Sequence, residues 1–379
     1  MKILFTLDTL AIGGTEKSTL DIVSHFSKKT MVKVVYFYPG DALKSDYENA
    51  NIDLHFVNLK GKRSFYKGII ALIKIIKTEK PDLIVSSIAR ANFISRIAGL
   101  LTNTTIVGTF VNDSYGEIRI QEHKEQKKYL KFRYTWLLDF CTSFIPKYWI
   151  SNCKSIAISN ANALKINRKK IEVIYRGRDT KKFKEWQMPA LNDNFKFVFI
   201  GRLIERKGLS ELLDAFSLLK KTNKNIQLDI FGSGPFEKKI RDKIQKYSLE
   251  DSVIMHGPVD NGWRELYNAH CFVFPSWYEG FSGSLVEAMI AGMPIVASDI
   301  TMNKEAVTDL KTALIFKVMD SKDLLSKMEI VIKNYPEMIE MGKKAREEAL
   351  NRFDIVTISN QYEQFLNSIV NKKVNIGQL

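Results

Sequence analysis

Short apolar runs alternate with segments of helical spacing along the first half of the chain. The apolar runs predict strands at residues 3–7, 32–37, 83–86, 105–111, 155–158 and 171–174. The segments between them predict helices over residues 15–28, 69–79 and 92–101. Strands that alternate with helices are typical of a parallel sheet that is covered on both faces.

A polar segment at residues 181–194 interrupts this alternation, and the same pattern then begins again. The second series of strands is predicted at residues 197–200, 226–231, 253–255, 271–274 and 295–297. The helices between and after them are predicted at residues 209–219, 236–247, 262–269 and 285–291. We therefore expect an α/β protein of two doubly wound, Rossmann-like domains that face a central cleft, because such sheets bind ligands at the carboxyl ends of their strands.

The length of 379 residues agrees with two domains, since it exceeds what one compact core usually holds. We place the N-terminal domain at 1–185 and the C-terminal domain at 186–352. Residues 353–379 form a terminal helix and tail. This last segment has apolar residues on one helical face, at Ile358, Tyr362, Phe365, Leu366 and Ile369.

The stretch from Phe274 to Met289 is the richest in chemical information. Its two carboxylates, Glu279 and Glu287, flank a series of small residues, Gly280, Ser282, Gly283 and Ser284. Small residues let a ligand approach backbone N–H groups closely, and the first N–H groups of a helix bind anions. Carboxylates beside an anion site suit a phosphate with hydroxyl-rich groups on both sides. This layout predicts a sugar nucleotide.

A second motif lies between Gly201 and Gly208, after a predicted strand and before a predicted helix. Its Arg202 offers a planar fork for phosphate oxygens, and its Lys207 adds a point charge. Together they could neutralise a diphosphate as its charge develops during a reaction. The alternative is a solvated basic loop, and this is how we interpret the neighbouring Arg206.

These motifs, in this order, resemble the signature of the family 4 glycosyltransferases. That family is retaining, depends on nucleotide sugars and has the GT-B fold. The resemblance is carried by Gly13–Glu16, Gly201–Gly208, Phe231–Pro235, His256–Gly257 and the Glu-x7-Glu stretch from Glu279 to Glu287. It covers most of the chain and implies that the N-terminal domain binds the acceptor and that the last helix crosses back onto that domain.

The resemblance also implies roles for single residues. Glu279 would contact the transferred sugar near the reacting centre, Glu287 would bind ribose hydroxyls, and Arg202 and Lys207 would stabilise the diphosphate. The remaining contacts to the nucleotide sugar would come from Gly13, Gly14, Asn112, Gly232, His256, Ser282, Gly283 and Ser284. Structural alternatives remain for several of these: a helix-terminal carboxylate for Glu287, an N-cap for either serine, and an ordinary βα turn for the glycine pair.

One departure concerns a histidine that relatives usually carry near the donor sugar. Asn112 stands there instead, and an amide can form hydrogen bonds but cannot titrate. This leaves two alternatives open: a non-catalytic protein that binds a nucleotide or an anionic polymer, and another GT-B enzyme such as a sugar-nucleotide epimerase. We interpret His123, in a charged run, and Arg176, where relatives often have Asn-Gly, as surface residues.

The formal net charge of +15 calls for an anionic partner. The basic residues of the first half form three clusters: Lys60, Lys62, Arg63 and Lys67; Lys124, Lys127, Lys128, Lys131 and Arg133; Lys165, Arg168, Lys169, Lys170, Arg176 and Arg178. No zinc finger or aromatic RNA-binding pattern occurs, so we expect no nucleic acid. The aromatic run from Tyr129 to Trp149 has two interpretations, a membrane interface or an aromatic core helix with a solvated basic face.

Cysteines, metal-binding motifs and apolar stretches narrow the prediction further. Three widely spaced cysteines form neither a disulfide framework nor a metal pattern, and no Asp-x-Asp occurs. No window offers about 18 uninterrupted apolar residues. We expect a cytoplasmic enzyme without metal or other cofactor, which meets its acceptor at the inner face of the cell membrane. It would transfer a sugar from a UDP- or GDP-sugar to a glycan or lipid-linked oligosaccharide in surface polysaccharide synthesis.

Overall fold

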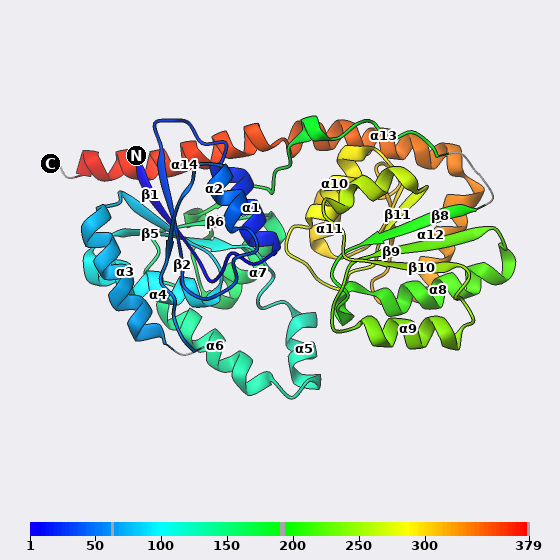
Figure 1. Ribbon diagram of the computed structural model, residues 1–379, viewed down its shortest axis with the longest axis horizontal. Coiled ribbons are helices and arrows are strands. Elements are labelled where there is room, and N and C mark those ends of the chain that lie inside the picture. Colours follow the sequence, from blue (N-terminus) through cyan, green and yellow to red (C-terminus); the bar gives the residue numbers. More distant parts are fainter. Residues whose placement is uncertain (62–63, 190–193, 377–379) are drawn as a thin grey trace. The chain divides into compact units, whose positions relative to one another are not determined.

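The computed structural model describes residues 1–61, 64–189 and 194–376, with side chains up to Lys372. Lys62 and Arg63 of the first basic cluster lie outside the described residues, as does part of the polar segment at 181–194. The chain forms two compact units (Figure 1). One comprises Met1–Gly177 with Ile355–Leu379, and the other comprises Arg178–Asp354. The boundaries predicted from the sequence lie after residues 185 and 352.

The N-terminal unit contains a seven-stranded sheet in which all paired strands are parallel. The strand order is β3-β2-β1-β4-β5-β6-β7, so the order reverses between β1 and β4. The strands are β1 (Lys2–Leu7), β2 (Met31–Tyr36), β3 (Asp53–Phe56), β4 (Leu83–Ser86), β5 (Thr105–Phe110), β6 (Tyr148–Ser151) and β7 (Ile171–Val173).

Helices cover both faces of this sheet. They are α1 (Gly14–Val23), α2 (Lys44–Asn49), α3 (Phe65–Glu79), α4 (Ala89–Thr102), α5 (Glu117–Glu125), α6 (Tyr129–Thr142), α7 (Lys154–Leu164) and α14 (Ile355–Ile376). Successive residues of a strand point to opposite faces. Accordingly Ile3 and Phe5 of β1 enter one buried core together with α14, whereas Leu4 enters a second core with α3 and α4. The sheet therefore lies between two apolar cores.

The last helix, α14, belongs to the N-terminal unit, as expected (Figure 1). Its buried face carries Ile358, Tyr362, Leu366 and Ile369 into the core of this unit. The Glu363 carboxylate also accepts hydrogen bonds from the backbone N–H of Ser27 at 3.0 Å and from its hydroxyl at 2.7 Å. The apolar stripe that was read from the sequence is thus the face that packs.

The C-terminal unit contains a six-stranded parallel sheet of order β10-β9-β8-β11-β12-β13. Its strands are β8 (Phe195–Ile200), β9 (Ile226–Phe231), β10 (Val253–Gly257), β11 (Cys271–Phe274), β12 (Ile295–Ser298) and β13 (Leu314–Phe316). Its helices are α8 (Leu209–Thr222), α9 (Glu237–Lys246), α10 (Gly283–Ala291), α11 (Thr301–Ala306), α12 (Ser321–Lys333) and α13 (Tyr335–Arg352). The expectation of two doubly wound units is confirmed.

Several predicted elements of the N-terminal unit are wrong. Residues 155–158, predicted as a strand, lie in helix α7, and the strand is β6, within the aromatic run. Strand β3 was missed because its sequence, Asp-Leu-His-Phe, has little apolar character. The core-helix interpretation of the aromatic run is also wrong, since Thr142 is the one buried residue of α6. Helix α1 ends at Val23 rather than Lys28.

Candidate functional site

The predicted donor motifs lie at one edge of the C-terminal sheet. Since all its strands are parallel, the loops that follow β8, β9, β10 and β11 leave from the same edge. The strand order reverses between β8 and β11, which is where open α/β sheets bind ligands. The loops after these two strands carry Arg202–Lys207 and Glu279.

Backbone hydrogen bonds connect these loops. The N–H of Gly201 donates to the carbonyl of Phe231 at 3.0 Å, and the N–H of Gly232 donates to the carbonyl of Gly257 at 2.7 Å. Across the reversal point, the N–H of Trp277 donates to the carbonyl of Arg206 at 2.8 Å. The structure therefore brings four motifs that are far apart in the sequence to one connected edge.

Two of the glycines permit the close backbone contacts that this edge requires. Gly232 has a φ of 142°, and a Cβ atom there would lie 1.9 Å from the carbonyl oxygen of Gly201. Gly208 has a φ of 70°, and its Cβ would lie 2.0 Å from the carbonyl oxygen of Pro275. No other residue combines positive φ with the absence of a side chain, so both positions require glycine.

Lys207 and Glu279 form a nearly buried ion pair, with side chains 10% and 11% exposed. The ammonium also lies 5.2 Å from the centre of the Phe274 ring. Burial by itself raises the pKa of the Glu279 carboxyl, but the charge and hydrogen bond of Lys207, with the charge of Arg206, outweigh burial and hold this pKa below its usual value. Glu279 is therefore ionised at neutral pH.

The two arginines of the loop differ from expectation. Arg206, predicted to be a surface residue, is half-buried, and its guanidinium lies 4.7 Å from the centre of the Tyr278 ring. That prediction is wrong, because the loop after β11 returns over the side chain. Arg202 is exposed on the same loop. Of the predicted cationic pair, the structure brings Lys207 into contact with Glu279.

Glu287 lies in the second turn of α10 and not in the first, because the helix already begins at Gly283. Its Oε1 accepts a hydrogen bond from Nε of Arg178 at 2.7 Å, and both side chains are largely buried. From the sequence alone, Arg178 is only one member of a basic cluster. No local sequence pattern predicts this contact, because Arg178 and Glu287 are 109 residues apart and only the tertiary structure brings them together.

The serines of the Glu-x7-Glu stretch lie at the start of α10. Ser282 occupies the N-cap position in an extended conformation, and its side chain makes no capping hydrogen bond. Its hydroxyl lies 3.2 Å from that of Ser284 instead. Helix α10 thus begins within the small-residue stretch, as the anion-site argument requires.

His256 lies at the same edge of the sheet, near the end of β10. Its Nε2 lies 2.8 Å from Oδ1 of Asp229, and its ring stacks on Phe231 with centroids 4.3 Å apart. These contacts fix the orientation of the imidazole beside the Gly232 turn.

The remaining predicted residues lie in the N-terminal unit. Gly13 is the N-cap of α1, and Gly14 is its first residue. A Cβ atom on Gly14 would lie 3.3 Å from Nη1 and Nη2 of Arg176, so this half-buried arginine lies beside the glycine pair. The prediction that Arg176 is only a surface residue is therefore wrong. Asn112 is exposed, just after β5.

Asn112 borders a cavity of about 410 Å³ within the N-terminal unit. His123, predicted as a surface residue, also lines this cavity and stacks on Phe132 at 5.0 Å between centroids. Burial, followed by the charge of Arg119, lowers the pKa of His123. The surface interpretation of His123 is wrong, because α5 turns its side chain toward α6.

Two absences concern the residues that the structure describes. In this part of the chain, no three His, Cys, Asp or Glu side chains are grouped so that they could hold a metal ion. Across residues 1–61, 64–189 and 194–376, no helix has the length and apolar character needed to cross a membrane.

Comparisons with known proteins agree with this geometry. The chain matches the family described as "Glycosyltransferase Family 4" over residues 12–182 and "Glycosyl transferases group 1" over residues 180–348. It is 25% identical over 363 residues to the capsular polysaccharide biosynthesis glycosyltransferase CapM of Staphylococcus aureus, covering 92% of this chain and 93% of CapM.

A second relative is the UDP-Gal:alpha-D-GlcNAc-diphosphoundecaprenol alpha-1,3-galactosyltransferase of Escherichia coli. It is 24% identical over 326 residues, which cover 81% of this chain and 80% of that enzyme. Among solved structures, Anabaena HepE in complex with UDP-glucose matches with a TM-score of 0.83 and 20% identity, covering 97% of this chain and 100% of HepE. The chain therefore has the GT-B fold and belongs to the family 4, group 1 glycosyltransferases, as a hexosyltransferase.

Proposed function

We propose that this enzyme transfers a hexose from a UDP-sugar, with retention of configuration, to a lipid-linked glycan during surface polysaccharide synthesis. The donor is supported by HepE, whose structures contain UDP and UDP-glucose. The acceptor class is supported by the Escherichia coli relative, whose name specifies a sugar linked to diphosphoundecaprenol. That name also specifies an alpha product, which results from retention where the donor sugar is alpha-linked.

The observation that carries the proposal is the arrangement of charges at the β8–β11 reversal point. The Lys207–Glu279 pair places an ammonium and an ionised carboxylate in a nearly buried position. We assign the ammonium to the diphosphate, whose negative charge grows as the sugar leaves. We assign Glu279 to hydroxyls of the sugar. Glu287, oriented by Arg178, then accepts hydrogen bonds from the ribose.

The proposal includes no metal ion. Arg202, Lys207 and the N-terminus of α10 would supply the positive charge that a divalent cation supplies to a diphosphate in other transferases. Transfer rates with and without EDTA test this point. A loss of activity in EDTA that Mg²⁺ or Mn²⁺ restores would contradict it.

The decisive experiment measures hydrolysis and transfer with UDP-glucose, UDP-galactose, UDP-N-acetylglucosamine and GDP-mannose. Wild-type protein should release UDP from at least one of them, whereas Glu279→Ala should lose most of this activity and still be stabilised thermally by UDP. Equal, near-zero rates in wild type and variant would contradict the proposal and favour a protein that only binds nucleotides.

We further propose that the enzyme works in the cytoplasm, at the inner face of the cell membrane, which it contacts through α6. Four large apolar side chains lie at helical spacing along this region and are at least half exposed: Leu130, Tyr134, Leu137 and Phe144. Lys131 and Arg133 are exposed on the same helix. Apolar side chains together with cations suit the boundary between headgroups and acyl chains of an anionic bilayer.

Sedimentation with vesicles tests the membrane contact. Wild type should bind phosphatidylglycerol vesicles at low salt and phosphatidylcholine vesicles more weakly, and the double substitution Leu130→Ser and Leu137→Ser should weaken binding. Leu101→Ser is the matched control, because Leu101 is 66% exposed on α4. Failure of the wild type to bind anionic vesicles would contradict this part of the proposal.

A further inference from the structure

The cavity of about 410 Å³ in the N-terminal unit lies where β4 and β5 end, between the start of α4 and helices α5 and α6. Much of its wall is aromatic or aliphatic, including Phe93, Phe110, Phe132 and Leu138. Ile88, which precedes α4 in this wall, has a φ of 73°. A β-branched residue in this region is strained. The position agrees with ligand binding at the carboxyl ends of parallel strands.

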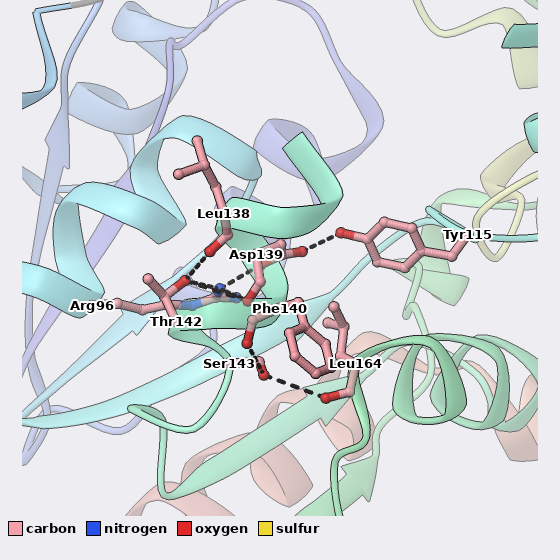
Figure 2. Close-up of polar contacts among 8 residues, drawn as sticks. All are labelled: Arg96, Tyr115, Leu138, Asp139, Phe140, Thr142, Ser143 and Leu164. Carbon is pink, nitrogen blue, oxygen red and sulfur yellow. Dashed lines mark hydrogen bonds and ion pairs between the residues drawn. The ribbon is translucent and has the colours of Figure 1, made fainter. Parts of the chain in front are cut away.

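Arg96 of α4 lines this cavity and is only 1% exposed. Its Nη1 donates to the Thr142 hydroxyl at 3.0 Å and forms an ion pair with Asp139 (Figure 2). Among the residues that the structure describes, its Nε and Nη2 have no hydrogen-bond partner. These two groups form one edge of the planar guanidinium, and such an edge matches two oxygens of a single phosphate or carboxylate.

The protein does not provide an anion for this edge. Asp139 is the one carboxylate among the described residues that line the cavity, and its oxygens already accept from Nη1 of Arg96 and from the Tyr115 hydroxyl (Figure 2). Four further cationic side chains line the cavity, Arg90, Arg119, Lys128 and Lys131, and of these Arg90 forms an ion pair with Asp8. The cavity therefore has an excess of positive charge.

A second buried group also lacks a partner. Asn92 is 8% exposed and lines the same cavity, and its Oδ1 accepts no hydrogen bond from any described residue. Buried polar groups that remain unsatisfied are rare, and a bound ligand is one of the few explanations for a group of them. Unlike the guanidinium edge, Oδ1 requires a donor, such as a hydroxyl.

We infer that this cavity binds an organic phosphate, with its phosphate against the Nε–Nη2 edge of Arg96 and its apolar or ring-shaped remainder against the aromatic wall. The inference rests on the proposed function and deepens it, because it assigns the phosphate group of the acceptor to named residues. Two sources share this chemistry: a prenyl diphosphate, as in a lipid-linked glycan, and a soluble sugar phosphate.

Equilibrium binding to the full chain tests the inference, with farnesyl diphosphate and glucose 1-phosphate as probes for the two sources. Farnesol is the control that lacks the phosphate, and inorganic diphosphate is the control that lacks the organic group. Wild type should bind at least one probe saturably and both controls at least about tenfold more weakly. Arg96→Lys keeps the charge but loses the planar edge, and should weaken binding of the probe at least about tenfold.

Arg96 is buried, so a second variant guards against misfolding. The double substitution Arg119→Gln and Lys131→Gln changes only cations lining the cavity and should also weaken the probe, whereas Lys169→Gln, at an exposed lysine outside the cavity, should not. UDP binding, measured in parallel, tests the proposed function separately and shows that each variant is folded. No saturable binding of either probe to wild type, or equal binding by wild type and both cavity variants, would overturn the inference.

Discussion

In the C-terminal unit, both carboxylates of the Glu-x7-Glu motif are already held by cations of the same unit, Glu279 by Lys207 and Glu287 by Arg178. In the N-terminal unit, two N–H groups of the buried Arg96 guanidinium have no hydrogen-bond partner in the described part of the chain. Paired charges fix the geometry of a site before a ligand arrives. Arg96 is also paired, with Asp139, but its unsatisfied Nε–Nη2 edge favours the arrival of a further anion. The buried charged groups of the two units are therefore satisfied to different extents.

The difference also explains why one unit is easier to recognise from sequence. The donor motifs predicted for the C-terminal unit are short stretches of neighbouring residues that contain glycines, a lysine and two carboxylates. The residues around the N-terminal cavity come from α4, β5, α5 and α6 and form no short motif. Their proximity became visible only when the fold brought them together.

The largest effect is expected from substitutions that break an ion pair of the C-terminal unit. Lys207→Ala or Glu279→Ala leaves the partner charge buried alone, which should lower the free energy of unfolding by about 3–5 kcal/mol. Each should also reduce the transfer rate about 100-fold or more. Urea unfolding and a UDP-release assay measure the two effects.

The double substitution Lys207→Met and Glu279→Gln is the control for this prediction. It removes both charges, so it should restore much of the stability while activity stays low. If the stability losses of the two single variants simply added in the double variant, the ion pair would not be the cause.

A second comparison uses one glycine from each unit. Gly232→Ala places Cβ 1.9 Å from a carbonyl oxygen at a φ of 142°, and should cost at least about 3 kcal/mol in the free energy of unfolding. Gly14→Ala meets only the end of the Arg176 side chain, so it should stay within about 1 kcal/mol of wild type. Thermal and urea unfolding measure both, and equal losses would refute the assigned role of the Gly232 backbone contact.

The pH dependence of stability should have opposite signs in the two units. The pKa of Glu279 lies below its ordinary value of 4.5, so its contribution is present above that pH and is lost as the pH falls through the lowered pKa. Burial raises the pKa of Asp8 above its ordinary 3.8 although Arg90 opposes this, so its contribution is lost as the pH rises through the raised pKa.

Unfolding free energies from pH 3 to 7 test these signs against the matched amides. Relative to Glu279→Gln, wild type should weaken as the pH falls below 4.5, and relative to Asp8→Asn it should weaken as the pH rises above 3.8. Each slope should not exceed about 1.4 kcal/mol per pH unit. The same sign for both pairs would refute the prediction.

The smallest effect concerns Arg206. Arg206→Gln removes a cation that lies 4.7 Å from the Tyr278 ring centre, which should cost about 0.5–1 kcal/mol in stability. It should also raise the pKa of Glu279 slightly, because the charge of Arg206 lowers that pKa. The matched background is Tyr278→Leu, which lacks the ring. In this background Arg206→Gln should cause no further loss of stability, and the same loss as in wild type would exclude the ring contact.

The sequence predicted the C-terminal unit more completely than the N-terminal unit. Strands β9 and β11 were predicted to the residue, and β8 and β12 within two residues, because their apolar runs are bounded by glycine, proline or polar residues. In the N-terminal unit, the aromatic residues of α6 and β6 are spaced with neither helical nor strand periodicity. Strand β6 was therefore missed, and a strand was predicted instead at residues that lie in α7. The polar edge strand β3 gave no signal at all.

By itself, the sequence determined the two parallel α/β units, the apolar face of the last helix and the residues of the predicted donor motifs, because periodicity and local glycine and carboxylate spacing are properties of neighbouring residues. The return of the last helix onto the N-terminal unit was implied by the resemblance to the family 4 glycosyltransferases. Only the tertiary structure decided which charges pair. Arg178 reaches Glu287 across 109 residues, and Arg96 reaches Asp139 across 43. Contacts of this kind depend on strand order and helix packing, and no local pattern of residues encodes them.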